Sequence, residues 1–307
     1  MQVRRLQAIN QYNVQIYGVV KWLDSIGLIL EYMPCGNLAQ FLNDDSPLRF
    51  CILVILRLFY ELAVGLAFMH NRPGGRQLVH GNLKPENVLL TSDFHCKLSD
   101  LGRLTALTDS KAYATSAYAS PEKLKSLNIT ATKEQDTYSF GMILYAILSG
   151  FSPSHRVDHE SAFKQTIISG ERPEEESIDE LRANLTEHQQ QILDVLRSMM
   201  RRCWAQEPSD RPTMLEVRDE LKSLLEQQSE ETMLLEEKEV LDTLHLSFNH
   251  DENPKTFLPL HIFSPKDRRF TQGSDLIVSQ IEFVAIQLVF SLFFQVQRSL
   301  QCFCVQV

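Results

Sequence analysis

The stretch Leu78-Val-His-Gly-Asn-Leu-Lys-Pro-Glu-Asn-Val-Leu-Leu90 decides the fold of this chain of 307 residues. Its polar centre lies between two apolar segments. In the segment before it, 47–70, apolar side chains recur every four residues, at Val54, Leu58, Leu62 and Leu66. That spacing predicts a helix with one apolar face, whereas the short apolar run at 87–90 predicts a strand. The polar residues are therefore expected in a loop between a buried helix and a strand.

Side chains in and after this loop have the chemistry that phosphoryl transfer to a hydroxyl requires. Such a reaction needs a carboxylate to receive the hydroxyl proton, ligands for magnesium, and a cation beside the transferred phosphate. Lys84 offers the cation, and the amide oxygen of Asn87 offers a metal ligand. Asp100 follows a second predicted strand at 95–98 and offers a carboxylate to magnesium, while Gly102 gives the chain freedom to turn.

The elements predicted on either side of the loop give the chain an α+β arrangement. Two strands are expected first, at 14–20 and 27–33. After the loop, an almost wholly apolar helix is expected from about 133 to 148, followed by helices at 187–204 and 214–245. A few strands followed by mostly helices is the order of an α+β protein.

These residues, in their order along the chain, resemble the motifs of the protein kinase family. His80-Gly-Asn-Leu-Lys-Pro-Glu-Asn87 resembles the catalytic loop His-Arg-Asp-Leu-Lys-Pro-x-Asn, and Asp100-Leu-Gly102 resembles the metal-binding Asp-Phe-Gly. Three later motifs agree in order and spacing: Ser120-Pro-Glu122, Asp136-Thr-Tyr-Ser-Phe-Gly141, and the run from Cys203 to Pro212.

The resemblance implies a protein-kinase-like fold with a truncated N-lobe and a complete, mainly helical C-lobe. It also implies structural roles for four side chains. His80 is expected to pack against the turn at Asp100 and not to act as a base. Asp136 is expected to begin the buried helix that organises the C-lobe. Glu122 and Arg211 are expected to form a buried salt bridge.

Finer details resemble the receptor-interacting protein (RIP) serine/threonine kinases, nearest the first or second member of that family. They are the hinge Glu31–Leu38, the run Pro47–Phe50, and the pairing of Asp93-Phe-His95 with Asp100-Leu-Gly102. The resemblance covers about residues 1 to 245. It implies ATP and magnesium as cofactors, and other signalling proteins, including RIP-family kinases, as partners. The nucleotide contacts that it implies are Leu30, Glu31, Met33, Leu89 and Asp100.

The same resemblance divides the chain into five segments. They are a partial N-lobe with the hinge at 1–34, a C-lobe at 35–227, a helical extension at 228–245, a linker at 246–275 and an apolar tail at 276–307. The Glu-rich run from Glu226 to Glu239 is expected either to bind a partner or to form a solvated extension packed on the C-lobe.

The catalytic loop departs from the family pattern at its most important position. Asn82 stands where the general base is expected, and an amide cannot usefully accept the substrate proton. Loss of a positioned base costs about 10² to 10⁴ in rate. Gly81 replaces the arginine that grips an activation-loop phosphate in the family. Hydroxyls between Arg103 and Ala119 therefore lack an ordering partner, and we expect them to be solvated.

The start of the chain also departs from the pattern. No glycine-rich loop and no strand lysine precede the strands at 14–20 and 27–33, so the upper wall of a nucleotide site is not encoded here. Two strands alone would leave an unpaired sheet edge. We expect the sequence to be an incomplete version of a longer protein, and a naturally truncated isoform is the alternative. ATP and magnesium binding by the chain as written is expected to be weak or absent.

The apolar segment 276–296 is long enough to span a bilayer, but Glu282 and three glutamines interrupt it. Three interpretations compete: a tail anchor with Cys302 and Cys304 as acylation sites, an amphipathic packing helix, and a non-native C-terminus. A membrane is expected as a partner only if the first of these holds.

The formal net charge of −9 argues against nucleic acid as a partner. Six scattered cysteines suit a reduced, cytoplasmic protein better than a disulfide framework or a zinc site. Three hypotheses follow. The preferred one is a RIP-kinase-like pseudokinase that acts as a signalling scaffold in cell-death or inflammatory signalling, necroptosis included. The alternatives are a fragment of an active ATP-dependent serine/threonine kinase, and a decayed lobe that does not fold stably.

Overall fold

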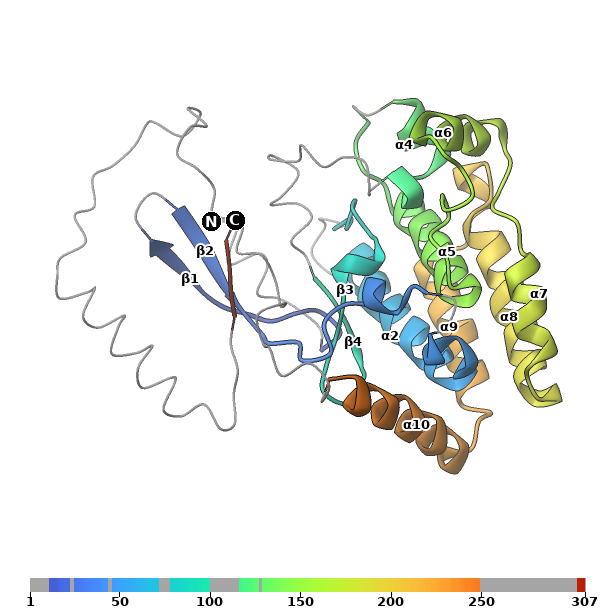
Figure 1. The fold of residues 1–307 in the computed structure, drawn as a ribbon. Coiled ribbons are helices and arrows are strands. Elements are labelled where there is room, and N and C mark those ends of the chain that lie inside the picture. The colour runs from blue at the N-terminus through green and yellow to red at the C-terminus, as the bar shows by residue number, and fades with distance from the viewer. Residues whose placement is uncertain are drawn as a thin grey trace, which may run out of the picture. The chain divides into compact units, whose positions relative to one another are not determined.

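The computed structural model describes residues 11–22, 25–43, 46–71, 78–99, 116–126, 129–248 and 303–306 (Figure 1). The chain forms two units, which are described separately. The helical unit consists of residues 1–14 and 33–253, and the sheet unit consists of residues 15–32 and 254–307. Many helices with a few short strands confirm the expected α+β class. Of the predicted linker at 246–275 and apolar tail at 276–307, the structure describes only residues 246–248 and 303–306.

Residues 12–14 belong to the helical unit because their backbone pairs with the end of strand β4 (Cys96–Leu98). The N–H of Val14 donates to the carbonyl of Leu98 at 2.8 Å, and the N–H of Leu98 donates to the carbonyl of Tyr12 at 2.9 Å. The predicted strand at 14–20 was therefore placed too early. It begins at Ile16, because the backbone of Val14 is already bound elsewhere.

The sheet unit has three antiparallel strands. Strand β1 (Ile16–Trp22) pairs with β2 (Ser25–Leu30), and β5 (Phe303–Gln306) pairs with the other side of β2. The expectation of a two-stranded remnant was wrong on this point. A segment from the far end of the sequence supplies the N–H and C=O groups that cover one edge of β2. The predicted strand at 27–33 ends earlier, at Leu30.

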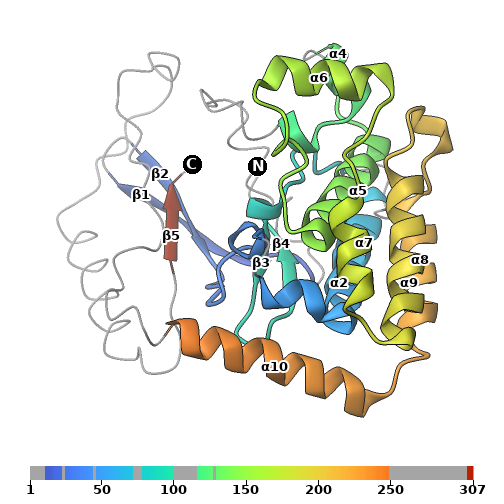
Figure 2. The same cartoon turned by 45° about the vertical axis from the view of Figure 1, so that its right-hand side comes forward.

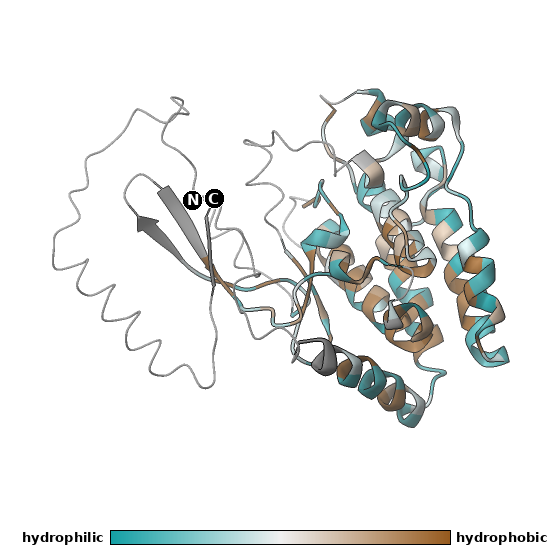
Figure 3. Cartoon of the chain, in the orientation of Figure 1, coloured by the Kyte–Doolittle hydropathy of each residue, from teal (hydrophilic) through white to brown (hydrophobic). Residues whose placement is uncertain are grey.

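Four long helices form the centre of the helical unit (Figure 2). They are α2 (Ile52–His70), α5 (Lys133–Ser149), α8 (Glu187–Cys203) and α9 (Met214–Leu225). Helix α2 packs against α9, and α5 packs against α8. Gly141 permits the second contact, since a Cβ there would lie 2.9 Å from Cβ of Cys203. The ribbon of these helices is brown along much of its length in Figure 3, and their apolar side chains form the buried core.

Three smaller helices went unpredicted. Helices α4 (Pro121–Lys125) and α6 (Glu160–Ser169) contact each other, and α7 (Glu176–Ala183) contacts α5. Each is at most ten residues long, and α6 and α7 turn only a narrow apolar face inward. A pattern this short does not stand out from its polar surroundings.

Helix α2 is the core of this unit. By length and composition it could cross a membrane, but 83% of its most apolar stretch of 18 residues is buried inside the protein. It does not run from 47 to 70 as predicted. A separate 3-10 helix at Pro47–Phe50 comes first, and the chain leaves helical geometry at Cys51, where ψ is 70°. Among the described side chains, the thiols of Cys35, Cys51, Cys96 and Cys203 are free and buried.

Strands β3 (Val88–Leu90) and β4 form the β3–β4 hairpin that follows the polar loop. Phe94 in its turn has a φ of 59°, a left-handed conformation that is costly for a side chain with a Cβ. Its ring is fully buried and packs edge-to-face on Phe41, with centroids 5.3 Å apart. Burial of this ring therefore stabilises the strained turn.

The long helix predicted at 214–245 is two helices. Helix α9 ends at Leu225, and α10 (Glu230–Phe248) begins after four intervening residues. The hydroxyl of Ser229 accepts from the N–H of Thr232 at 3.2 Å, which starts α10 as a new helix. The break matters because it lets α10 turn back against α2 (Figures 1 and 2).

Candidate functional site

The polar loop is anchored to the first turn of α5 by the carboxylate of Asp136, which is 1% exposed. One oxygen, Oδ2, accepts from the backbone N–H of His80 at 2.8 Å and from Nε2 of His70 at 2.8 Å. The other, Oδ1, accepts from the N–H of Gly81 at 2.8 Å. Three donors from two segments thus converge on one buried carboxylate, which fixes the start of the loop.

Gly81 is held from both sides of its peptide. Its φ is 72°, and a Cβ at this position would lie 3.1 Å from Cβ of Ala131. Its carbonyl accepts from Nζ of Lys123 at 2.6 Å. Burial lowers the pKa of the Lys123 ammonium, while the charge of Asp136 acts in the opposite direction. Gly81 thus stands at the position of the family's arginine, and the ammonium of Lys123, on α4, lies beside its carbonyl.

The ring of His80 joins the loop to the end of β4. The ring atom Nε2 lies 3.1 Å from the carbonyl of Ser99, and Nδ1 lies 3.3 Å from the backbone nitrogen of Asn82. A backbone N–H can only donate, so Nδ1 accepts and Nε2 carries the hydrogen. With both nitrogens engaged and the residue 1% exposed, His80 is placed for the structural role expected of it.

Asn82 and Asn87 lie together at the centre of the loop. The amide Nδ2 of Asn87 donates to the carbonyl of Asn82 at 2.7 Å, and its own carbonyl accepts from the N–H of Ser99 at 2.9 Å. The first bond orients the Asn87 side chain, because it assigns the nitrogen and leaves the amide oxygen Oδ1 as the atom for a metal. Lys84 lies between them in the sequence, where its backbone is extended, and it is half-buried.

The donor set fits magnesium only in part. The orientation of Asn87 suits a metal ligand, and hard oxygen donors are what magnesium prefers. Within the described residues, no group of three or more His, Cys, Asp or Glu side chains could hold a metal ion. Asp100, the predicted carboxylate ligand, and Gly102 lie outside the described residues.

The predicted nucleotide contacts fall in both units. Leu30 is buried in the sheet unit, where the carboxylate of Glu31 accepts from the N–H of Gln15 at 3.2 Å. Met33 is buried in the helical unit, and half-buried Leu89 lies in β3 of the same unit. These assignments remain predictions.

The ion pair expected between Glu122 and Arg211 is present and bidentate. The guanidinium nitrogens Nη1 and Nη2 donate to the two carboxylate oxygens at 2.8 and 2.9 Å. The Arg211 side chain is 0% exposed, and it also donates to three backbone carbonyls and lies over the ring of Tyr138. Burial acts to raise the pKa of Glu122, but the hydrogen bond from Arg211 and further contacts hold that pKa below its ordinary value.

The hydroxyls of the predicted activation segment lie mostly outside the described residues. Tyr118 is within them, and it is not solvated as expected. It is 4% exposed, burial raises the pKa of its phenol, and its carbonyl accepts from the hydroxyl of Ser139 at 2.8 Å. Among the site residues above, Lys123 and His70 could not be selected from the sequence, because no motif contains them.

Comparisons with known proteins agree with this geometry. The family described as protein kinase domain matches residues 2–221. Receptor-interacting serine/threonine-protein kinase 1 of Homo sapiens is 30% identical over 240 residues, which cover 72% of this chain and 33% of that protein. The fourth such kinase, of Mus musculus, is 29% identical over 72% of this chain and 27% of its own length. The second, of Bos taurus, is 28% identical over 73% and 42%. The chain thus spans less than half the length of these relatives.

Proposed function

The chain belongs to the protein kinase domain family, and from that premise we propose that it is a RIP-kinase-like pseudokinase that works by binding other proteins. Asn82 carries the proposal. It occupies the position of the family's general base, and its amide offers no site with useful basicity. The backbone of the loop is held in one defined arrangement by Asp136, Lys123 and His80. What the loop lacks is therefore the basic side chain and not its conformation.

Nucleotide binding is proposed to be weak. Lys84 and Asn87 are retained and would face the phosphates and the metal, with Asp100 as the carboxylate ligand. Magnesium, when bound, would neutralise charge on the phosphates. The protein's own part is to orient the amide of Asn87 through its bond to the carbonyl of Asn82.

The scaffold role rests on the RIP-kinase resemblance. We propose a cytoplasmic protein that binds other signalling proteins, RIP-family kinases among them, in cell-death or inflammatory signalling such as necroptosis. Its acidic charge of −9 disfavours nucleic acid as a partner.

The alternative is a fragment of an active serine/threonine kinase. One observation favours it: Lys84, Asn87 and Asp100 all survive, although a site without function is under no chemical requirement to keep them. Transcript sequence upstream of Met1 that encodes a glycine-rich loop and a strand lysine would support this alternative.

Asn82→Asp is expected to raise the rate of phosphoryl transfer by about 10² to 10⁴, because it restores a proton acceptor to a loop that is already held in place. The measurement is the initial rate of transfer from magnesium ATP to a generic protein substrate, at matched nucleotide saturation.

Two variants make this test specific. Asn82→Ala removes the amide without supplying a base, and it should stay at the wild-type rate. Lys125→Ala changes an exposed lysine of the same short helix as Lys123 and should have no effect. Equal rates for Asn82→Asp and Asn82→Ala, at unchanged nucleotide affinity, would show that the missing base is not what limits the wild-type protein.

A further inference from the structure

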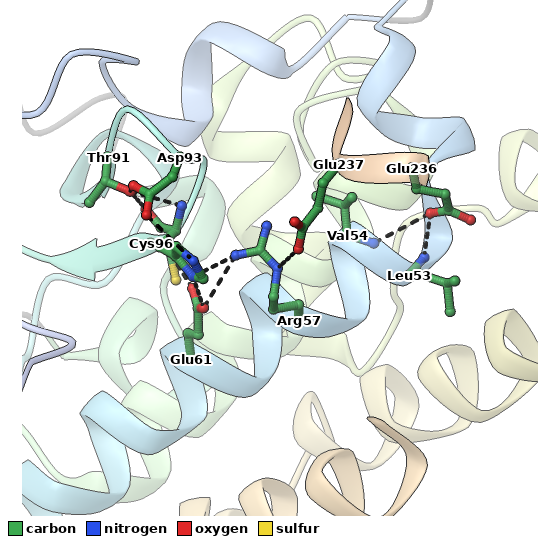
Figure 4. Close-up of polar contacts among 10 residues, drawn as sticks. Leu53, Val54, Arg57, Glu61, Thr91, Asp93, Cys96, Glu236 and Glu237 are labelled. Atoms are coloured by element: carbon green, nitrogen blue, oxygen red, sulfur yellow. Dashed lines mark hydrogen bonds and ion pairs between the residues drawn. The ribbon is translucent and has the colours of Figure 1, made fainter. Parts of the chain in front are cut away.

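Helix α10 caps the N-terminus of α2 through a carboxylate (Figure 4). Helix α2 has no side-chain cap of its own at Cys51. Instead, Oε2 of Glu236 accepts from the backbone N–H of Leu53 at 2.8 Å and of Val54 at 3.4 Å. The first turn of a helix presents unpaired N–H groups, and a carboxylate is their best partner. Glu236 is 8% exposed, and its Oε1 accepts from Gln189 at 2.9 Å.

The next carboxylate of α10 binds a buried cation one turn further along α2. Oε1 of Glu237 lies 2.9 Å from Nε of Arg57, whose side chain is 8% exposed. This ion pair lacks hydrogen-bond geometry, and among the described residues Nη2 of Arg57 has no hydrogen-bond partner. Its Nη1 donates to Oε1 of Glu61 on α2 at 3.4 Å and lies 2.6 Å from Nδ1 of His95 on the hairpin. The guanidinium thus lies between Glu237 of α10 and these two residues.

Glu61 carries the contact from α2 to the β3–β4 hairpin. Its Oε2 accepts from the N–H of Cys96 at 2.8 Å, and its Oε1 binds Nδ1 of His95. The hydrogen bond to Glu61 raises the pKa of His95. Figure 4 shows Arg57 between the two sets of contacts, with α10 on one side and the hairpin on the other.

The β3–β4 hairpin is directly continuous with the candidate site. Asn87 immediately precedes β3, and Ser99 immediately follows β4. The two are bonded to each other, N–H of Ser99 to carbonyl of Asn87, at 2.9 Å. A displacement of the hairpin therefore displaces the amide that is proposed to face the metal.

We propose that Arg57 and Glu61 are positioning residues for this hairpin and that α10 controls them through Glu236 and Glu237. Helix α10 begins at Glu230, beyond residue 221 where the family match ends, so the control is an addition to the kinase domain. The consequence for the metal-side residue Asn87 rests on the function proposed above. The coupling between α10 and the hairpin does not.

We call the contacts from Glu236 and Glu237 through Arg57 and Glu61 to the β3–β4 hairpin the relay. A buried thiol lies at each of its two ends. Cys96 is 1% exposed at the hairpin, with its thiol bonded to the carbonyl of Leu58 at 3.1 Å. Cys51 is 3% exposed beside α10, where burial first and the charge of Glu236 second raise the pKa of its thiol to about 12. Cys203 is fully buried between α5 and α8, away from the relay, and serves as the reference.

The experiment measures the rate at which a thiol reagent modifies each cysteine of the full chain, resolved by peptide mass spectrometry. Glu237→Ala is expected to speed the modification of Cys96 roughly tenfold, since it leaves a buried cation short of a countercharge. Glu236→Ala should do the same by freeing α10 from the α2 N-terminus. Glu231→Ala removes an exposed carboxylate of the same helix and should leave every rate unchanged.

Cys96 decides the result, because loss of the Glu236 charge alone would raise the reactivity of Cys51. Arg57→Met adds a second readout: in that background, Glu237→Ala should no longer change the Cys96 rate. Faster modification of Cys51 with an unchanged Cys96 rate would overturn the relay. An equal increase at Cys203 would overturn it as well, since that pattern is global unfolding. Neither outcome depends on nucleotide binding, so the relay and the pseudokinase proposal can fail separately.

Discussion

Asp136→Ala is expected to lower the free energy of unfolding of the helical unit by at least about 3 kcal/mol. The substitution leaves three buried donors without an acceptor, namely Nε2 of His70 and the N–H groups of His80 and Gly81. Each unsatisfied buried donor costs about 1 to 3 kcal/mol. The measurement is the urea midpoint followed by fluorescence of Trp204, which lies in this unit and is 5% exposed.

Two variants separate the loss of the Asp136 hydrogen bonds from a general effect of removing a carboxylate. Asp158→Ala changes an exposed aspartate of the same unit and should leave the free energy of unfolding within about 0.5 kcal/mol of the wild-type value. Asp136→Asn keeps one acceptor oxygen and should lie between wild type and Asp136→Ala. If the urea midpoint of Asp136→Ala matched that of Asp158→Ala, the Asp136 carboxylate would not anchor the loop.

Arg211→Ala is expected to cost about 3 to 5 kcal/mol, the usual effect of breaking a buried ion pair by removing one partner. Glu122 would keep its carboxylate, and the carbonyls of Ala205, Gln206 and Glu134 would each lose a donor. Thermal unfolding is the measurement. Arg156→Ala is the control, because that arginine and its partners Glu174 and Glu176 all have exposed side chains, where ion pairs contribute little.

The same pair predicts the direction of a pH effect. The folded-state pKa of Glu122 lies below its ordinary value of 4.5, so this group contributes stability above that value. The contribution is lost as the pH falls through the lowered folded-state pKa. The difference in stability between wild type and Glu122→Gln should therefore shrink on acidification. A difference that stays constant down to acid unfolding would contradict the pairing.

Sequence alone was sufficient where a local pattern carried the information. The four-residue spacing from Val54 to Leu66 predicted α2, and the apolar run after Lys133 predicted α5. The order of the motifs pointed to the family, which the match over 2–221 confirms. The pairing of Glu122 with Arg211 could be expected for the same reason, because both residues lie within recognisable motifs.

Contacts between distant segments of ordinary composition could not be predicted. Lys123 binds the carbonyl of Gly81 across 42 residues, and no local pattern marks either partner for the other. The division of 214–245 into α9 and α10 depends on Glu236 and Glu237 reaching α2, which draws the chain back on itself. Strand β5 pairs with β2 from the opposite end of the sequence. In each case the tertiary contact decides the local structure, and periodicity records only the local preference.

The most direct test of the central claim is the transfer of labelled phosphate from magnesium ATP by the wild-type full chain, to itself and to a generic substrate, compared with Asp100→Ala. If Asn82 has removed catalysis, both proteins should incorporate label at the same background rate. Incorporation by the wild type that Asp100→Ala abolishes would contradict the pseudokinase account, because it would show phosphoryl transfer at this site without a carboxylate base.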